Sequence, residues 1–456
     1  YVYREAGYTF DAGPTIITAP YLFEELWQVS GRRMADDVTI KSLDPFYEVR
    51  FDDGQIFKYT ADLAQMRAQI AAIEPADVPG FERFLEASKT IFATAFAELA
   101  DQPFHELSTL FAAAPDLLRL GGHRSVYSEV SRFFKSEKLR LLFSFHPLLI
   151  GGNPFTTTAY YCLIAHLERT YGVHYAEGGM GALVRGIVGL VEQHGGSIRC
   201  NTGVDKILVE KGRAVGVQLE DGSRLEADVV VSNADAATTY QKLLRDHPRR
   251  RWTDAKLARA SYSMSLFVWY FGTSRRYDDV YHHMMVLGPR YKALLDDIFI
   301  RKHLADDFSL YLHRPTASDA SLAPPGHDAF YVLAPVPNLL SGTDWREHAE
   351  PYRAAVQRRL EETVLPGLGA SLTVSKMLTP IDFRDRLSSV NGAAFALEPK
   401  LFQSAWFRPH NKSEEVDRLY LVGAGTHPGA GLPGVVSSAK ILDEIVPDPR
   451  VIAARR

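Results

Sequence analysis

The spacing of apolar residues predicts both helices and strands along this chain of 456 residues. A helix is predicted over residues 181–194, because apolar side chains recur there every three to four positions and Gly195-Gly196 follows. Its apolar face consists of Leu183, Val184, Ile187, Val188 and Val191. Strands separated by tight turns are predicted next, at 197–201, 204–209, 214–219 and 228–232. The last of these is an unbroken apolar run, which is typical of a buried parallel strand.

Two longer regions show further patterns. Residues 60–145 have a mainly helical period, whereas residues 260–395 contain β-rich runs at 263–271, 308–313 and 329–334. Apolar residues between 96 and 120 predict one of two arrangements. They form either a helix pair packed on the core or a helix that lies on a membrane surface and opens a substrate channel. The aromatic residues of the β-rich runs either line an apolar tunnel or belong to an ordinary core.

Composition narrows the class of protein. A length of 456 residues predicts two or three subdomains, and 46% hydrophobic with 23% charged residues is typical of globular proteins. A formal charge of −4 gives no general case for nucleic-acid binding. Only Cys162 and Cys200 occur, which predicts a reducing cytoplasm rather than a disulfide framework. No apolar run approaches the roughly 18 residues that span a bilayer, and no signal peptide is expected.

The densest chemical signal lies in residues 419–440. A short apolar strand, 419–422, is followed by five glycines and two prolines within twelve residues, and a small-residue helix begins near Pro433. Glycine lets the backbone approach a ligand closely, and a helix N-terminus offers free N–H groups and a positive dipole end. The run predicts a cradle for a phosphate or a flavin edge. The alternative is a tight strand-to-helix connection without a ligand.

Four other segments accompany this glycine run in the same order as in one known family. They are Gly7–Thr18, Phe143–Phe155, Tyr175–Val184 and Ser404–Asn411. Together these segments closely resemble the bacterial-type phytoene desaturases, within the larger group of amine-oxidase-like flavoproteins. The resemblance extends over nearly the whole chain and is more specific than any single glycine motif.

The resemblance implies an α/β fold in which a discontinuous Rossmann-like FAD-binding domain carries an inserted β-sheet and helical substrate domain. The sequence opens at Tyr1 without the strand, Gly-x-Gly-x-x-Gly turn and helix that hold a dinucleotide pyrophosphate. We therefore expect the N-terminal βαβ unit to be missing here and dinucleotide binding to be weak without it. The expected FAD-domain parts are 1–60 (truncated), 171–240 and 396–456. A helical part that faces substrate and membrane is expected at 61–170, and a β-rich substrate domain at 241–395.

The resemblance also implies which residues contact FAD. The expected cofactor-binding residues are Gly13, Pro14, Thr15, Val204, Asn233, Ala234, Gly423, Gly425, Thr426, Gly434 and Val435. Among them, the backbone at Val204 is expected beside the adenine, and Asn233-Ala234 is expected to return the chain to the cofactor.

The implied activity is stepwise, FAD-dependent desaturation of phytoene toward a lycopene-type carotene. Affinity for such an uncharged polyene comes from apolar burial, and the expected tunnel walls are Phe145, Phe155 and Trp406. His427 is the candidate catalytic base, or else it caps the cofactor loop. Arg124 and His146 either serve the flavin and tunnel or are structural, and a mechanism without a protein base is also allowed. The expected partners are a membrane surface, which the protein contacts peripherally, and quinone or oxygen as electron acceptor.

Other chemistries find little support in the sequence. His282 and His283 are adjacent, and adjacent side chains on a strand point to opposite faces, so no metal site is expected. No Gly-x-Ser-x-Gly elbow indicates a hydrolase. Two alternatives stay open: a related carotenoid isomerase or ketolase, and a non-catalytic escort protein that binds prenyl groups or lipids. The glycine run at 423–434 favours a flavin enzyme over the escort protein.

Overall fold

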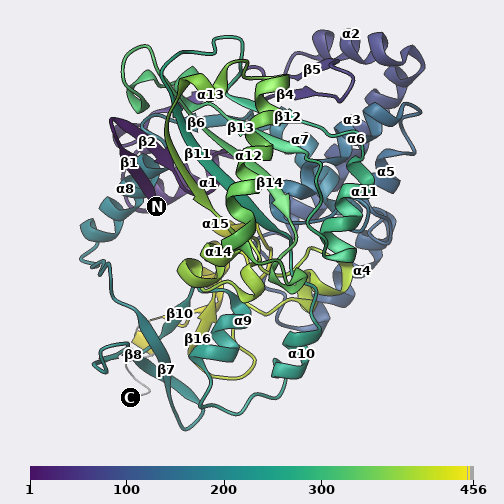
Figure 1. Cartoon of the computed structure of the whole chain (residues 1–456). Helices are drawn as coiled ribbons and strands as arrows, with labels where there is room; N and C mark the ends of the chain where they lie inside the picture. Colours follow the sequence, from purple (N-terminus) through teal and green to yellow (C-terminus); the bar gives the residue numbers. More distant parts are fainter. Residues whose placement is uncertain (449, 452–456) are drawn as a thin grey trace.

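The computed structural model describes residues 1–448 and 450–451, and a sheet of seven strands forms its middle (Figure 1). The strand order is β15 (Leu372–Leu378), β11 (Ser265–Thr273), β14 (Asp328–Val336), β13 (Leu310–His313), β12 (His283–Val286), β4 (Tyr47–Arg50) and β5 (Ile56–Tyr59). All neighbours pair antiparallel except β12 and β4, which are parallel. The three β-rich runs predicted from the sequence are confirmed as β11, β13 and β14.

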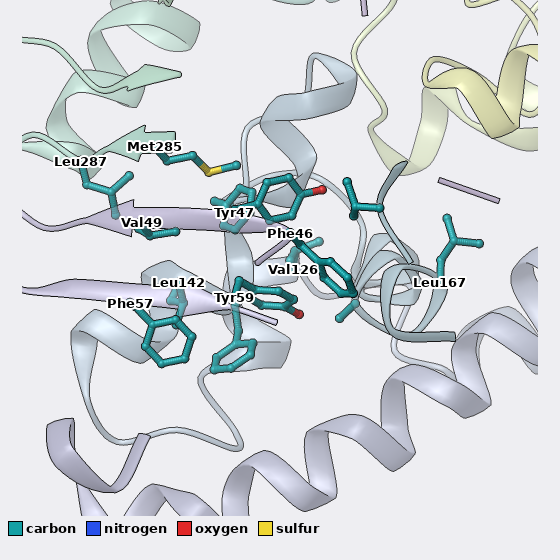
Figure 2. Packing of buried hydrophobic residues seen from close by; sticks show 14 of the residues in the cluster. Phe46, Tyr47, Val49, Phe57, Tyr59, Val126, Leu142, Leu167, Met285 and Leu287 are labelled. Atoms are coloured by element: carbon teal, nitrogen blue, oxygen red, sulfur yellow. The ribbon is translucent and has the colours of Figure 1, made fainter. Parts of the chain in front are cut away.

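One face of this sheet packs against helix α12 (Trp345–Thr363), and the other faces a second, larger core. Strand alternation assigns neighbouring residues to different faces, so Phe267 and Trp269 belong to the α12 side while Leu266 and Val268 belong to the other. The larger core continues under the short strands. Figure 2 shows Tyr47, Val49, Phe57 and Tyr59 of β4 and β5 packed with Met285 of β12 and Leu142 of helix α6 (Glu137–Ser144).

Helices between residues 63 and 171 gather beside the sheet, on the right of Figure 1. They are α2 (Leu63–Ile73), α3 (Val78–Phe92), α4 (Leu107–Arg119), α5 (Val126–Val130), α6 (Glu137–Ser144) and α7 (Leu163–Tyr171). The helical period predicted for residues 60–145 is thereby confirmed. The packed-core interpretation of residues 96–120 is wrong for three side chains of α4: Leu107, Phe111 and Leu118 are 49%, 71% and 60% exposed. No helix within the described residues is long and apolar enough to cross a bilayer.

The parallel pairing expected of a dinucleotide-binding domain occurs between β10 (Val230–Ser232) and β16 (Leu419–Leu421). These strands lie almost 190 residues apart in sequence, which confirms that the α/β fold is assembled from distant segments. Beside them, β7 (Val204–Glu210), β8 (Arg213–Leu219) and β9 (Arg224–Glu226) form an antiparallel sheet in the lower part of Figure 1. Helix α15 (Leu432–Ile445) follows β16 through the glycine run.

The remaining elements connect these parts. They are β1 (Val2–Glu5), β2 (Tyr8–Asp11), α1 (Tyr21–Val29), β3 (Ile40–Ser42), β6 (His174–Ala176), α8 (Met180–Gln193), α9 (Ala236–Thr238), α10 (Asp254–Arg259), α11 (Tyr291–Asp296), α13 (Leu368–Ser371) and α14 (Pro380–Leu387). The helix predicted over 181–194 is confirmed as α8. The strand predicted at 197–201 is wrong, because those residues are exposed and belong to no strand in the described part of the chain.

Candidate functional site

A cavity of about 580 Å³ lies between the large sheet, the helical region and the glycine run. Most of its wall is apolar. The wall is formed by the loop after β2, the segment around residues 95–104, helix α7, strands β11 and β14, and the C-terminal loop. Its apolar residues include Ile16, Phe96, Phe104, Leu163, Leu167, Leu266, Val268, Leu333 and Val435. Because these segments span both ends and the middle of the chain, the cavity exists only in the folded protein.

The loop after β2 delivers Gly13, Pro14 and Thr15 to the cavity wall. The entry of this loop is fixed by the Asp11 carboxylate, which accepts hydrogen bonds from the backbone N–H groups of Met180 (2.7 Å) and Gly181 (3.1 Å). These two amides open helix α8, so the carboxylate also complements the positive end of that helix. Burial raises the pKa of Asp11, and the two backbone hydrogen bonds oppose the rise.

A group of three hydroxyls adjoins this loop on the sheet side. The Thr15 hydroxyl lies 2.6 Å from the Tyr331 hydroxyl and 3.3 Å from the Tyr311 hydroxyl, and all three residues line the cavity. Burial raises the pKa of Tyr331 well above 10, so both phenols stay protonated at neutral pH. The hydroxyls therefore act as neutral hydrogen-bonding groups that hold the Gly13–Thr15 loop against the sheet.

The glycine run packs too tightly for side chains at several positions. A Cβ on Gly425 would lie 2.8 Å from the backbone nitrogen of Ala236, and one on Gly434 would lie 2.7 Å from the carbonyl oxygen of Gly429. Gly423 has a φ of +95°, and its N–H donates to Ser438 Oγ at 2.8 Å. The run is therefore a close-approach loop that leads into α15, as a cradle for a large planar or phosphate-bearing cofactor requires.

Arg408, which the sequence analysis did not single out, supports this loop from behind. Its guanidinium is fully buried and donates to the carbonyl oxygens of Ala424 (2.8 Å), Leu397 (3.0 Å) and Gln403 (3.1 Å). Burial lowers the pKa of Arg408, although its group still remains charged. A fixed positive charge thus lies beside the loop. Arg408 lies inside the segment 404–411 that resembles the family, and this position could have indicated its importance from the sequence.

Glu168 is a second residue that the sequence analysis missed. It lies on α7, is 1% exposed and still lines the cavity. The Tyr47 hydroxyl donates to one carboxylate oxygen, and His146 Nε2 lies 3.2 Å from the other. The signal in the sequence was a single acid among the apolar residues Leu163, Ile164 and Leu167, which line the same cavity. The arrangement presents a positioned carboxylate inside an otherwise apolar chamber.

His427, the candidate base from the sequence, also lines the cavity. Its Nε2 lies 3.1 Å from the Leu99 carbonyl oxygen, and its ring packs edge-on against Phe104 with centroids 4.7 Å apart. Burial lowers the pKa of His427 to about 4. A histidine with so low a pKa is a weak base at neutral pH, and its contacts are those of a residue that holds the glycine run to the helical region.

The structure brings some, not all, of the predicted site residues to the cavity. Those that line it are Gly13, Pro14, Thr15, His427, Gly434, Val435 and Phe145. Gly423, Gly425 and Thr426 belong to the glycine run, and Asn233 lies against Gly423. These four residues, Ala234 and Val204, which begins β7, are not part of the cavity wall. Their contacts with a cofactor stay predictions.

Four other predicted residues have specific partners. Phe155 packs on Tyr127 (centroids 4.6 Å apart), and Trp406 lies under the Arg251 guanidinium at 4.4 Å, so neither belongs to the described wall. Arg124 forms an ion pair with Glu129 at 2.9 Å, which favours its structural interpretation. His146 contacts Glu168 and thereby acts on the cavity indirectly.

Comparison with known proteins identifies the class to which this fold and site belong. The profile of the family described as "Flavin containing amine oxidoreductase" matches residues 1–441. The structure of putrescine oxidase with bound putrescine has the same fold, with a TM-score of 0.64 and 11% sequence identity. The matched region covers 98% of this chain and 90% of the putrescine oxidase chain. The chain is a flavin-dependent oxidoreductase of this family.

Two curated relatives place it more narrowly. The phytoene desaturase (neurosporene-forming) of Cereibacter sphaeroides is 49% identical over 449 residues, which cover 97% of this chain and 86% of the relative. The phytoene desaturase (lycopene-forming) of Pseudescherichia vulneris is 48% identical over 441 residues, which cover 96% and 90%. The chain belongs to the bacterial-type phytoene desaturases.

Proposed function

We propose that this protein is an FAD-dependent desaturase that converts phytoene stepwise to a lycopene-type carotene. The observation that carries the proposal is the apolar cavity of about 580 Å³, which adjoins the glycine run and contains the buried Glu168 carboxylate. Relatives that are 48–49% identical over nearly the whole chain form neurosporene or lycopene from this substrate, as their names state.

The residues present fit the flavin portion of FAD. The close approach at Gly425 and Gly434, the N-terminus of α15 and the fixed charge of Arg408 supply backbone amides and positive potential where an electron-rich group would lie. Residues 13–15, 233–234, 423–426 and 434–435, with Val204 on the adenine side, would hold FAD. The bound flavin supplies the acceptor for the hydride that leaves the substrate.

Apolar burial would bind the substrate. Each Å² of hydrocarbon removed from water contributes about 25 cal/mol, and a polyene offers no charged group for a salt bridge. Residues such as Leu167, Val268 and Leu333 provide this surface, and the shape of the cavity orients the chain of double bonds. The wall also excludes water from the reacting carbons.

Glu168 is our candidate for the residue that accepts the proton, in place of His427. Desaturation breaks C–H bonds on two neighbouring carbons. One hydrogen leaves as hydride and the other as a proton, and the electron pair of the second C–H bond forms the new C=C bond. A carboxylate in an apolar chamber attracts the positive charge that develops on the substrate and takes the proton. Tyr47 and His146 hold its two oxygens in place and so orient the lone pairs.

We further propose that the protein works on the cytoplasmic surface of a membrane, with quinone or oxygen as final electron acceptor. The support is local. The cavity wall includes Phe96, Leu99 and Phe104, and the chain continues directly into α4, which exposes Leu107, Phe111 and Leu118. An exposed apolar helix face beside a lipid-soluble substrate's cavity suits insertion into the headgroup region. Both cysteines are free, as in a reducing compartment.

The deciding experiment mixes the purified enzyme and FAD with phytoene-loaded liposomes, follows visible absorption and identifies products by chromatography. Coloured carotenes that appear only with FAD would support the desaturase, and their conjugation length would give the number of steps. Bound flavin with isomerised or oxygenated carotenes would favour the isomerase or ketolase. A protein that binds carotene and no flavin would refute the proposal and favour the escort protein.

A further inference from the structure

Three histidines from two paired strands meet in the interior behind the cavity wall. His283 on β12 lies directly opposite His313 on β13, and one ring nitrogen from each of these two and from His282 lies within 4.8 Å of the others. The three side chains are 6% exposed or less. The expectation that His282 and His283 diverge is wrong, because His282 precedes the first residue of β12, where strand alternation does not apply.

Hydrogen bonds to residues outside the cluster orient two of these rings. His282 Nδ1 lies 2.7 Å from Ser318 Oγ, and His283 Nδ1 lies 2.7 Å from the Tyr311 hydroxyl. The Nε2 atoms of His282 and His313 are 3.0 Å apart. Metal-binding histidines are usually held in this way, with one ring nitrogen hydrogen-bonded to an outer partner and the other turned to the ion.

Two ring nitrogens at the cluster lack a partner. Among the described residues, His283 Nε2 and His313 Nδ1 accept or donate no hydrogen bond although both are buried. A buried polar atom without a hydrogen-bond partner destabilises the fold, and such atoms often mark a bound ion or water.

The surroundings favour a borderline transition metal over a hard cation. The donor set is three imidazoles, and no carboxylate of the described residues forms an ion pair with any of the three rings. The nearby guanidinium of Arg314 is already neutralised by Asp328 (2.9 Å) and Asp278 (3.0 Å). Three imidazoles with a water as fourth ligand suit Zn²⁺, whereas Ca²⁺ and Mg²⁺ require oxygen ligands.

We propose that His282, His283 and His313 bind a divalent first-row transition metal ion, with Zn²⁺ as the natural occupant. The ion would tie β12 to β13 and fix Tyr311, whose hydroxyl reaches both His283 and the Thr15 loop. Its role is structural, and the three histidines that would hold it do not line the cavity. Desaturase activity and metal binding can therefore fail independently.

The test uses tag-free, flavin-loaded enzyme that has been dialysed against a chelator and then titrated with Co²⁺ and Zn²⁺. The expected result is one equivalent of Co²⁺ with the visible absorption of a four-coordinate site of three nitrogens and one water oxygen, displacement of Co²⁺ by Zn²⁺, and a higher melting temperature with Zn²⁺ bound. Absence of stoichiometric binding by the wild-type protein would overturn the proposal, whatever the variants do.

Variants locate the ion. His283→Gln and His313→Gln are expected to abolish the Co²⁺ band, whereas His348→Gln, an exposed histidine on α12, should retain it. Ser318→Ala removes only the outer partner of His282 and should weaken binding by about 10–100-fold, which provides a readout if a histidine variant fails to fold. A band of unchanged affinity in Ser318→Ala, His283→Gln and His313→Gln would assign the metal to another place.

Discussion

The two faces of strand β11 are equally apolar, yet only one of them borders the cavity. The cavity face presents Leu266, Val268 and Tyr270. The opposite face presents Phe267, Trp269 and Phe271, which pack under α12. The neighbouring strand β14 repeats the division, with Tyr331 and Leu333 on the cavity side and Phe330 and Val332 in the other core. The sequence left open whether these aromatics line a tunnel or fill a core, and both interpretations are right, one for each face.

The two faces of this sheet therefore serve different purposes: one stabilises the fold, and the other borders the site of the proposed chemistry. The α12 face is closed by large rings in mutual contact, such as Trp269 and Phe271 at 4.3 Å between centroids. The cavity face keeps a space open and places polar groups around it, among them the Tyr331–Thr15 pair. We therefore expect substitutions on the α12 face to act on folding, and substitutions around the cavity to act on turnover.

The largest effect is expected from Trp269→Ala. The ring is fully buried, and its deletion leaves a void in a packed core, so the free energy of unfolding should fall by about 3–5 kcal/mol in urea titrations. Val268→Ala is the matched control on the opposite face of the same strand. Because Val268 already borders an open space, its loss should cost only about 1 kcal/mol. Equal losses from the two substitutions would contradict the comparison.

Glu168→Gln tests the chemical side. The amide retains the shape of the carboxylate and can still hydrogen-bond with Tyr47 and His146, but it cannot take up a proton. The rate of carotene formation should fall by about 10²–10⁴-fold, with flavin content and melting temperature nearly unchanged. Glu86→Gln, on the exposed side of α3, is the control and should leave the rate as it is. A Glu168→Gln enzyme within twofold of wild type would exclude a role for this residue as the base.

The glycine positions near the cavity could be read from the sequence more readily than the polar groups inside it. Glycine positions such as Gly425 and Gly434 are readable because close backbone contact admits no other residue. Phe145 was found for the same kind of reason, since an apolar substrate needs apolar walls. The discontinuous flavin domain that the order of the family-like segments implies stays a prediction.

What could not be predicted depends on contacts between distant segments. The Glu168 carboxylate is held in place by Tyr47, which lies 121 residues earlier in the sequence. His282 and His313 come together only because β12 pairs with β13. The rule of strand alternation failed at His282 because it depends on where the strand begins, and strand ends are the least certain feature of a sequence pattern.

The pH dependence of stability should also reside on the cavity side. The pKa of His427 falls from 6.5 in the unfolded chain to about 4 in the fold, so the unfolded state binds more protons between these values. The stabilising contribution is complete above pH 6.5 and is lost as the pH falls toward 4. Between pH 7 and pH 5 the wild type should lose about 2 kcal/mol more than His427→Gln, measured by urea unfolding at each pH. An identical pH profile for both proteins would show that His427 is not the responsible group.

The smallest expected effect comes from removing one hydroxyl on either face. Tyr331→Phe breaks the 2.6 Å contact with Thr15, and Tyr277→Phe on the α12 side breaks the 3.1 Å contact with Ser371 Oγ. Each should cost about 1 kcal/mol of unfolding free energy, because a net intramolecular hydrogen bond contributes that much. Only Tyr331→Phe should weaken flavin binding, by a few-fold in a fluorescence titration, since Thr15 carries the cofactor-facing loop and retains Tyr311 as a second, longer partner. If Tyr277→Phe weakened flavin binding as much as Tyr331→Phe does, the proposed difference in function between the two faces of the sheet would be wrong.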